Sequence, residues 1–128
     1  MTEPSVLKMA APQFVVSDVV KTAEYYRDVF GFEIHGYFAD PPVFAILGRD
    51  NVELHVGKID EGKKMHMNEM IRSGLGSDLY VRVSDIERLH NELREKNADI
   101  VEGPIRRIYD MTEITVRDCN GFQIVFGA

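Results

Sequence analysis

The sequence predicts an α+β domain built from two tandem βαβββ modules, and three observations support this. Strand-like and helix-like segments follow one another in the same order in both halves of the 128-residue chain. A Val-Ser-Asp tripeptide at residues 16–18 returns at residues 83–85. Each half also ends in runs of alternating apolar and polar residues separated by a turn, as in a hairpin with one buried face. We therefore expect a duplicated unit.

The first module is expected to cover about residues 10–57 and to begin with a strand at 13–16. Ser17 or Asp18 can cap a helix that follows. Apolar residues then recur at spacings of four, three and four, which places them on one helical face: Val19, Ala23, Tyr26 and Phe30. Gly31 is typical of a helix C-terminus. A strand resumes after it.

A hairpin completes the first module. After the break at residues 41–42, the apolar run 43–47 leads through a turn at 48–51 into the alternating run 52–56. Residues 58–77 are then expected to form a linker, with a short helix around residues 67–71. The linker precedes the second half of the duplication.

The second module is expected over about residues 78–127. The run 79–83 alternates, and Ser84 with Glu87 has the spacing of a capping box, so we expect a helix to start there. Ile86, Leu89 and Leu93 supply its apolar face. A strand follows near residue 99, and a hairpin with an Asn-Gly turn closes the chain.

Composition excludes several classes of protein. With 45% hydrophobic and 28% charged residues, the chain is expected to form one globular domain over residues 1–128. No apolar run approaches the roughly 20 residues that cross a bilayer, and the N-terminus lacks the features of a secretory signal. One cysteine, Cys119, favours a cytoplasmic location. A net charge of −6 argues against nucleic acid and is compatible with a cationic or neutral ligand.

Strand alternation also indicates which side chains face away from the buried apolar residues. On the expected strands these include one carboxylate next to a histidine, Glu53 and His55, and an aromatic residue, Tyr80. A ligand site needs shape, aromatic surface and a few polar groups. The candidate ligand-binding residues are Gln13, Phe44, Glu53, His55, Asp78, Tyr80, Arg82 and Gln123.

Several of these segments together resemble the glyoxalase/bleomycin resistance protein/dioxygenase, or vicinal oxygen chelate, superfamily. They are residues 16–18, 25–32, 52–56 and 117–124, and the match covers about residues 10–127. The resemblance implies curved mixed sheets around a U-shaped cavity, often with a divalent metal ion, and a homodimer. It does not fix the chemistry, because the superfamily includes isomerases, dioxygenases, thiol transferases and non-catalytic drug binders.

The resemblance also implies where metal ligands would lie, namely at Ala11, Glu53, Asp78 and Val125. Only Glu53 is of the usual ligand type, and Asp78 can coordinate in principle, whereas alanine and valine offer no donor atom. A shift to the next residue on the same strand face would bring in Gln13 or His55. We therefore expect neither a metal cofactor nor catalytic residues. A divalent ion on Glu53 and Asp78 remains the alternative.

The leading hypothesis is a small-molecule binding protein like the bleomycin-resistance branch. It would sequester a hydrophobic, in particular a cationic, ligand in a dimeric cup without metal and thereby give antibiotic resistance. The alternative is a metal-dependent glyoxalase-type lyase or extradiol-type dioxygenase that uses Glu53. A third hypothesis is an interaction module whose cup is filled by its own side chains. No motif for nucleophilic catalysis is present in the sequence.

Overall fold

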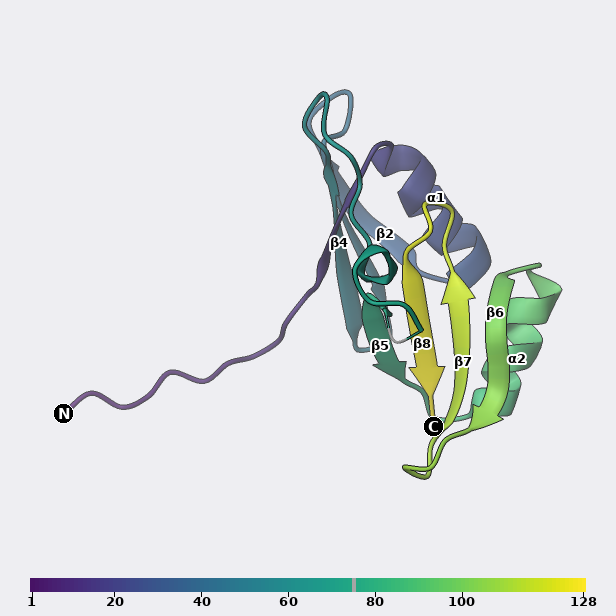
Figure 1. Ribbon diagram of the computed structural model, residues 1–128. Helices are drawn as coiled ribbons and strands as arrows, with labels where there is room; N and C mark the ends of the chain where they lie inside the picture. Colours follow the sequence, from purple (N-terminus) through teal and green to yellow (C-terminus); the bar gives the residue numbers. More distant parts are fainter. Residues whose placement is uncertain (75) are drawn as a thin grey trace.

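The computed structural model describes residues 1–74 and 76–128 and contains two modules with the same order of elements (Figure 1). The first consists of β1 (Gln13–Val16), α1 (Val19–Phe30), β2 (Glu33–Phe38), β3 (Phe44–Arg49) and β4 (Val52–Lys58). The second consists of β5 (Leu79–Arg82), α2 (Ile86–Glu95), β6 (Asp99–Arg106), β7 (Thr112–Arg117) and β8 (Gln123–Gly127). The predicted α+β fold of two βαβββ modules is confirmed.

Each module forms its own four-stranded mixed sheet. Sheet 1 has the order β1-β4-β3-β2 and sheet 2 the order β5-β8-β7-β6. The first strand of each module pairs in parallel with its last strand, and the other pairs are antiparallel. This register places Gln13 opposite His55 in sheet 1 and Tyr80 opposite Val125 in sheet 2.

The repeated Val-Ser-Asp tripeptide has the same role in both modules. Its aspartate is the N-cap: the Asp18 carboxylate accepts the N–H of Lys21 at 3.0 Å, and Asp85 accepts that of Arg88 at 3.0 Å. The expected capping box of Ser84 with Glu87 is wrong by one position. Asp85 competes successfully because an extended backbone at that residue aims its carboxylate at the first helical turn.

One hydrophobic core joins the two modules. α1 packs on β2, β3 and β4, and its predicted apolar face is buried. α2 packs on β6 and β7. Rings from the two modules meet directly, since Phe14 stacks on Phe122 at 4.4 Å between ring centroids and Phe30 contacts Phe126 at 6.3 Å. Aromatic rings therefore fill the centre of the core where the two modules meet.

Two features of the sheets depend on special residues. Gly31 ends α1 with φ of 73°, a left-handed conformation that disfavours a side chain. β6 continues through Gly103 and Pro104, with shifts of register on both sides of Glu102. Proline is tolerated there because β6 is an edge strand, where one row of N–H groups has no partner strand.

Segments outside the modules are mostly irregular. Residues 1–12 contain no helix or strand and extend away from the domain (Figure 1). The short helix expected around residues 67–71 is present as a 3-10 turn, η1 (Asn68–Met70). Over the residues that the structure describes, no helix is long and apolar enough to span a membrane.

Candidate functional site

Each sheet has one face on the core and one face turned away from it, and we call the latter open face 1 and open face 2. Because cross-strand partners point to the same side, the register assigns the members of each face. Open face 1 carries Gln13, Phe38, Phe44, Ile46, Glu53 and His55. Open face 2 carries Tyr80, Arg82, Glu113, Thr115, Gln123 and Val125. All the predicted site residues except Asp78 belong to these two sets.

Open face 1 combines an aromatic wall with an acid and a base. The His55 ring nitrogen Nε2 lies 2.7 Å from Glu53 Oε2, and both side chains are about a third exposed, at 28% and 31%. Phe44 contacts the His55 ring edge-on at 5.4 Å, and Phe38 contacts Phe44 at 5.8 Å. Phe38 is 55% exposed. This face can hold an apolar ring against the phenylalanines with a polar group at Glu53.

A glycine in the last strand of each module makes room for a side chain of the first strand. A Cβ on Gly57 would lie 2.7 Å from Nε2 of Gln13, and a Cβ on Gly127 would overlap the hydroxyl oxygen of Tyr80. Gln13 and Tyr80 thus lie flat across equivalent glycines. The duplication extends to the candidate binding surfaces.

Asp78 and Gln123 are both tied to the segment between the modules. Asp78 accepts the backbone N–H of Asn68 at 2.8 Å and that of Gln123 at 2.9 Å, one on each carboxylate oxygen. The Gln123 amide donates to Glu69. Asp78 therefore fastens η1 to the start of β8, and both of its oxygens already have a partner.

Open face 2 centres on a residue that the sequence did not single out, Glu113. Its side chain is only 4% exposed, and it accepts hydrogen bonds from Tyr80 at 2.8 Å, from Tyr109 at 2.7 and 2.8 Å, and from Nε of Arg107 at 3.0 Å. Arg107 also binds Glu102. Alternation within residues 112–117 could have placed Glu113 beside Thr115. Nothing local indicates that the loop at residues 107–111 folds back over it.

The surroundings of Glu113 keep it ionised. Burial acts to raise the pKa of the Glu113 carboxyl, but the hydrogen bonds from Tyr109, Tyr80 and Arg107 outweigh it, so that the pKa is lowered. Burial, and then the bond to Glu113, raises the pKa of Tyr80, and the bond to Glu113 raises that of Tyr109. At neutral pH the group is a carboxylate surrounded by neutral phenols and one guanidinium.

A second buried carboxylate, Asp118, is structural. Its Oδ1 accepts the N–H groups of Asn120, Gly121 and Phe122 at 2.8 to 3.0 Å, and its Oδ2 accepts the Tyr26 hydroxyl at 2.7 Å. Burial raises the pKa of Asp118 in spite of these bonds. The residue fixes the β7–β8 turn and joins it to α1 of the other module.

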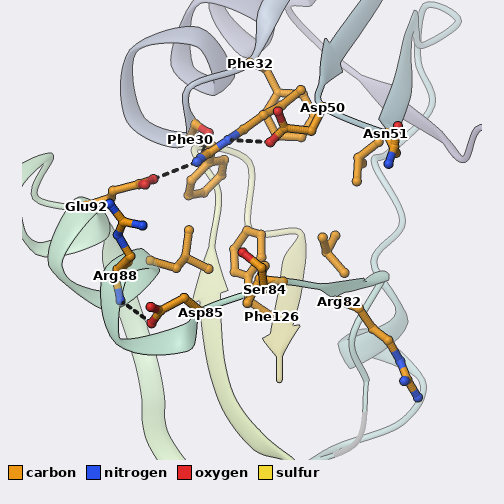
Figure 2. A pocket seen from close by; sticks show the side chains of 15 residues that line it. Phe30, Phe32, Asp50, Asn51, Arg82, Ser84, Asp85, Arg88, Glu92 and Phe126 are labelled. Atoms are coloured by element: carbon orange, nitrogen blue, oxygen red, sulfur yellow. Dashed lines mark hydrogen bonds and ion pairs between the residues drawn. The ribbon is translucent and has the colours of Figure 1, made fainter.

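A cavity of about 490 Å³ lies at the junction of the modules, and core-face residues of both, such as Val52 and Val81, line it (Figure 2). Its lining includes Phe30, Phe32 and Phe126 together with Arg49. Arg49 donates to the Phe30 carbonyl and to Glu92 of α2, each at 2.9 Å. The guanidinium of Arg82 points away from these side chains (Figure 2). The Arg49 contacts thus link α1, the β3–β4 hairpin and α2.

Comparison with known proteins identifies the family. The family model described as Glyoxalase/Bleomycin resistance protein/Dioxygenase superfamily matches residues 8–126. The chain belongs to this superfamily. Resemblance on the sequence motifs is thereby confirmed for nearly the whole length of the chain.

Proteins similar to this superfamily member include a relative by sequence and several solved structures. A metallothiol transferase, FosB, from Staphylococcus haemolyticus is 26% identical over 111 residues, which are 87% of this chain and 76% of that protein. TioX from Micromonospora sp. ML1 has a similar structure, with a TM-score of 0.74, 19% identity and coverage of 94% and 97% of the two chains. A superfamily member from Sphaerobacter thermophilus gives a TM-score of 0.71 at 16% identity, with 95% and 97% covered.

The register allows the family's metal positions to be tested in this superfamily member. Val125 lies opposite Tyr80, as His55 lies opposite Gln13, so the counterpart of Val125 is His55 and not Glu53 as the sequence suggested. Among the residues described, no three His, Cys, Asp or Glu side chains are grouped so that they could hold a metal ion. Glu53 and His55 alone do not fit the three or four donors of a catalytic site.

Proposed function

We propose that this protein binds a hydrophobic, cationic small molecule in a cup lined by the two open faces, and that a homodimer completes the cup. The observation that carries the proposal is the uncovered wall of Phe38, Phe44 and His55 beside Glu53 on open face 1. A soluble sheet commonly turns polar residues outward, whereas this wall presents aromatic rings. Rings combined with a few polar groups are typical of ligand sites.

Apolar surface supports the same conclusion for both faces. Phe38 and Val15 on sheet 1 and Tyr80 on sheet 2 are exposed by 55%, 41% and 44%. Covering such groups is favourable by about 25 cal/mol for each Å² of apolar area removed from water. A guest with a flat apolar body would gain this energy, and the carboxylates of Glu53 and Glu113 would favour a positive charge on it.

The proposal includes a second copy of the chain because nothing described in a single copy covers the two open faces. Both sheets direct their inner faces to one shared core, so that the open faces lie on the outside of it. A partner would enclose a guest between open faces of the two copies and exclude water. Native mass spectrometry at micromolar concentration measures this directly, and a monomer with bound guest would contradict the dimeric cup.

Calorimetry with metal-free bleomycin in EDTA tests the binding function. Phe44→Ala is expected to weaken binding roughly tenfold or more, because a buried phenylalanine contributes about 1.5–3 kcal/mol. Tyr37→Ala is the matched control, since Tyr37 is a half-exposed ring on the same sheet that lies opposite Ala45, on the other side from Phe44. Equal loss in both variants, or no heat with the wild type, would count against the site or against this ligand class.

Sequestration of this kind would take place in the cytoplasm, the compartment favoured by the unpaired Cys119, and would give resistance if the guest is an antibiotic. The chain itself would perform no reaction on the guest. Growth of cells that express the protein, measured against increasing bleomycin, tests the resistance. The Phe44→Ala variant should remove the protection if binding is its cause.

A metal-dependent enzyme is the second candidate, and the contact between Glu53 and His55 favours it. One curated relative is named a metallothiol transferase, which lends this candidate further support. A glyoxalase-type lyase or an extradiol-type dioxygenase would need at least one more donor, supplied by the second copy. Elemental analysis of the purified dimer separates the candidates: a stoichiometric divalent metal that is lost in Glu53→Gln would favour the enzyme.

A further inference from the structure

We propose that Glu113 is the residue of the cup that binds the positive group of the guest, an ammonium or a guanidinium beside the rings of Tyr80 and Tyr109, and that the loop at residues 107–111 covers Glu113 until the guest arrives. This inference rests on the proposed function and specifies where the charge of the guest is bound. It differs from the sequence analysis, which considered Glu53 and Asp78, and not Glu113, among the candidate ligand-binding residues.

The position of Glu113 places it in the cup. It lies on β7 with Gly127 of β8 directly opposite, and the core face of β7 is occupied by Ile114 and Val116, so the carboxylate is on open face 2. Gly127 has no side chain, and this leaves the space through which Tyr80 reaches Glu113. The corresponding position of open face 1 is Phe44, which lies opposite Gly57. One face therefore offers a ring and the other a charge at equivalent places.

Glu113 shares the cation that contacts it with a second carboxylate, and Arg82 lies beyond Gly127 on the same face. Arg107 is the cation that contacts it, and the same guanidinium also binds Glu102, so two carboxylates share one positive charge. Tyr80 and Tyr109 donate hydrogen bonds and remain neutral. Asp78, in contrast, uses both oxygens on backbone N–H groups of its own chain. Main-chain donors thus hold Asp78, whereas Glu113 is held by side chains, which can rotate away to admit a cation.

The groups that cover Glu113 come mostly from a loop that can open. Three side chains donate to it: Arg107 and Tyr109 from the β6–β7 loop, the latter with one hydroxyl placed between both carboxylate oxygens, and Tyr80 within the sheet. Tyr109 is 59% exposed and its neighbour Ile108 is fully exposed, so apolar packing does not hold the loop in place. Opening needs only an exchange of these hydrogen bonds for bonds to the guest and to water.

The cluster also has the chemistry of a cation site. A carboxylate supplies the charge, and tyrosine rings attract cations through the negative faces of their π systems. Unlike Asp118, which is held mainly by backbone N–H groups of its own turn, Glu113 is covered by side chains of a loop, and its charge becomes available for recognition when that loop opens.

Three probes with the same ring and different charge test the proposal by calorimetry on the full-length protein: (2-naphthylmethyl)trimethylammonium, 2-naphthylmethanol and 2-naphthoate. The wild type should bind the cation roughly tenfold more tightly than the neutral alcohol, as expected for a charge-assisted contact out of water. Glu113→Gln should remove this preference and leave the affinity for the alcohol unchanged. Glu24→Gln, on the exposed side of α1, is the matched control and should keep the preference.

A second variant keeps the proposal testable if Glu113→Gln does not fold. Tyr109→Phe retains the ring but loses the hydroxyl that covers both oxygens of Glu113. Because the guest no longer competes with that hydroxyl, the affinity for the cation should rise several-fold while the affinity for the alcohol stays the same. An unchanged or weaker affinity for the cation would contradict the covering role of the loop.

The outcomes separate this inference from the proposed function. If no probe binds, or if Phe44→Ala does not weaken any of them, the cup itself is refuted. If the alcohol and the cation bind equally well to the wild type, or if Glu53→Gln and not Glu113→Gln removes the preference for the cation, the assignment of Glu113 is overturned. If Glu53→Gln removes the preference, the cup is retained and the positive group of the guest binds on open face 1.

Discussion

The hydroxyl of Tyr26 links the two modules, and its removal in Tyr26→Phe is expected to destabilise the protein. Tyr26 is fully buried on α1 and donates to Asp118 at 2.7 Å, in the β7–β8 turn of the second module. The variant keeps the ring contacts with Phe30 and Phe32. The change therefore isolates one hydrogen bond to a buried carboxylate.

The expected loss of unfolding free energy at neutral pH is about 2 kcal/mol, within the range of about 1.5–3 kcal/mol for hydrogen bonds to charged groups. The loss should be smaller in acid. Burial raises the pKa of Asp118 above its unfolded value, so folding favours the protonated form, and the contribution of this group falls as pH rises through the folded pKa. Tyr26→Phe removes a bond that stabilises the ionised form, and its cost grows with pH in the same interval.

Urea denaturation followed by circular dichroism, at neutral pH and near pH 4, measures these differences. Tyr25→Phe is the matched control: Tyr25 precedes Tyr26 on α1, and its hydroxyl makes no hydrogen bond to the residues described, so its loss should cost less than about 0.5 kcal/mol. If Tyr26→Phe and Tyr25→Phe cost the same, or if the cost of Tyr26→Phe is larger in acid, the role given to the Asp118 contact is wrong.

Three further changes have expected outcomes. Glu113→Gln should lower the free energy of unfolding by about 2 kcal/mol at neutral pH. The pKa of Glu113 is lowered by folding, so its contribution to stability is present above its unfolded pKa and is lost as pH falls through the folded pKa. The loss in the variant should therefore disappear in acid, and urea titrations across this pH interval check it. Gly127→Ala should cost about 1–3 kcal/mol by displacing Tyr80, and most of it should be recovered in the double variant with Tyr80→Ala, as thermal melting would show. Arg49→Met should lower the melting temperature by a few degrees, whereas Glu92→Gln, which leaves the other contacts of Arg49, should lower it less.

Local patterns were sufficient to predict the elements and the face on which most candidate residues lie. The spacing of apolar residues from Val19 to Phe30 fixed α1, and alternation in residues 52–56 fixed β4 and placed Glu53 and His55 together. Helix periodicity and strand alternation are properties of neighbouring residues, which a sequence shows directly. The error at the start of α2 arose from the same source, because Ser84 and Asp85 are both good N-caps and only the backbone decides between them.

Local sequence patterns could not predict the register between strands that are distant in the chain. Alternation gives the face of a side chain but not its partner on the next strand, and β1 and β4 pair in parallel across the whole helix and hairpin between them. For this reason the equivalence of Val125 with Glu53 was wrong and that with His55 appears only in the folded sheets. Asp78 similarly faces solvent in the pattern but bonds to the backbone of Asn68 in the structure.

Periodicity and short motifs were enough to predict the duplicated βαβββ architecture, the superfamily, and Phe44 and Glu53 on open face 1. The burial of Glu113 under Arg107 and Tyr109, and the link from Asp118 to Tyr26 between the modules, became visible only in the folded chain. The physical reason is the range of the interactions. Buried carboxylates are stabilised by donors from a folded-back loop or from the other module, and such donors are brought to them only when the whole chain has folded.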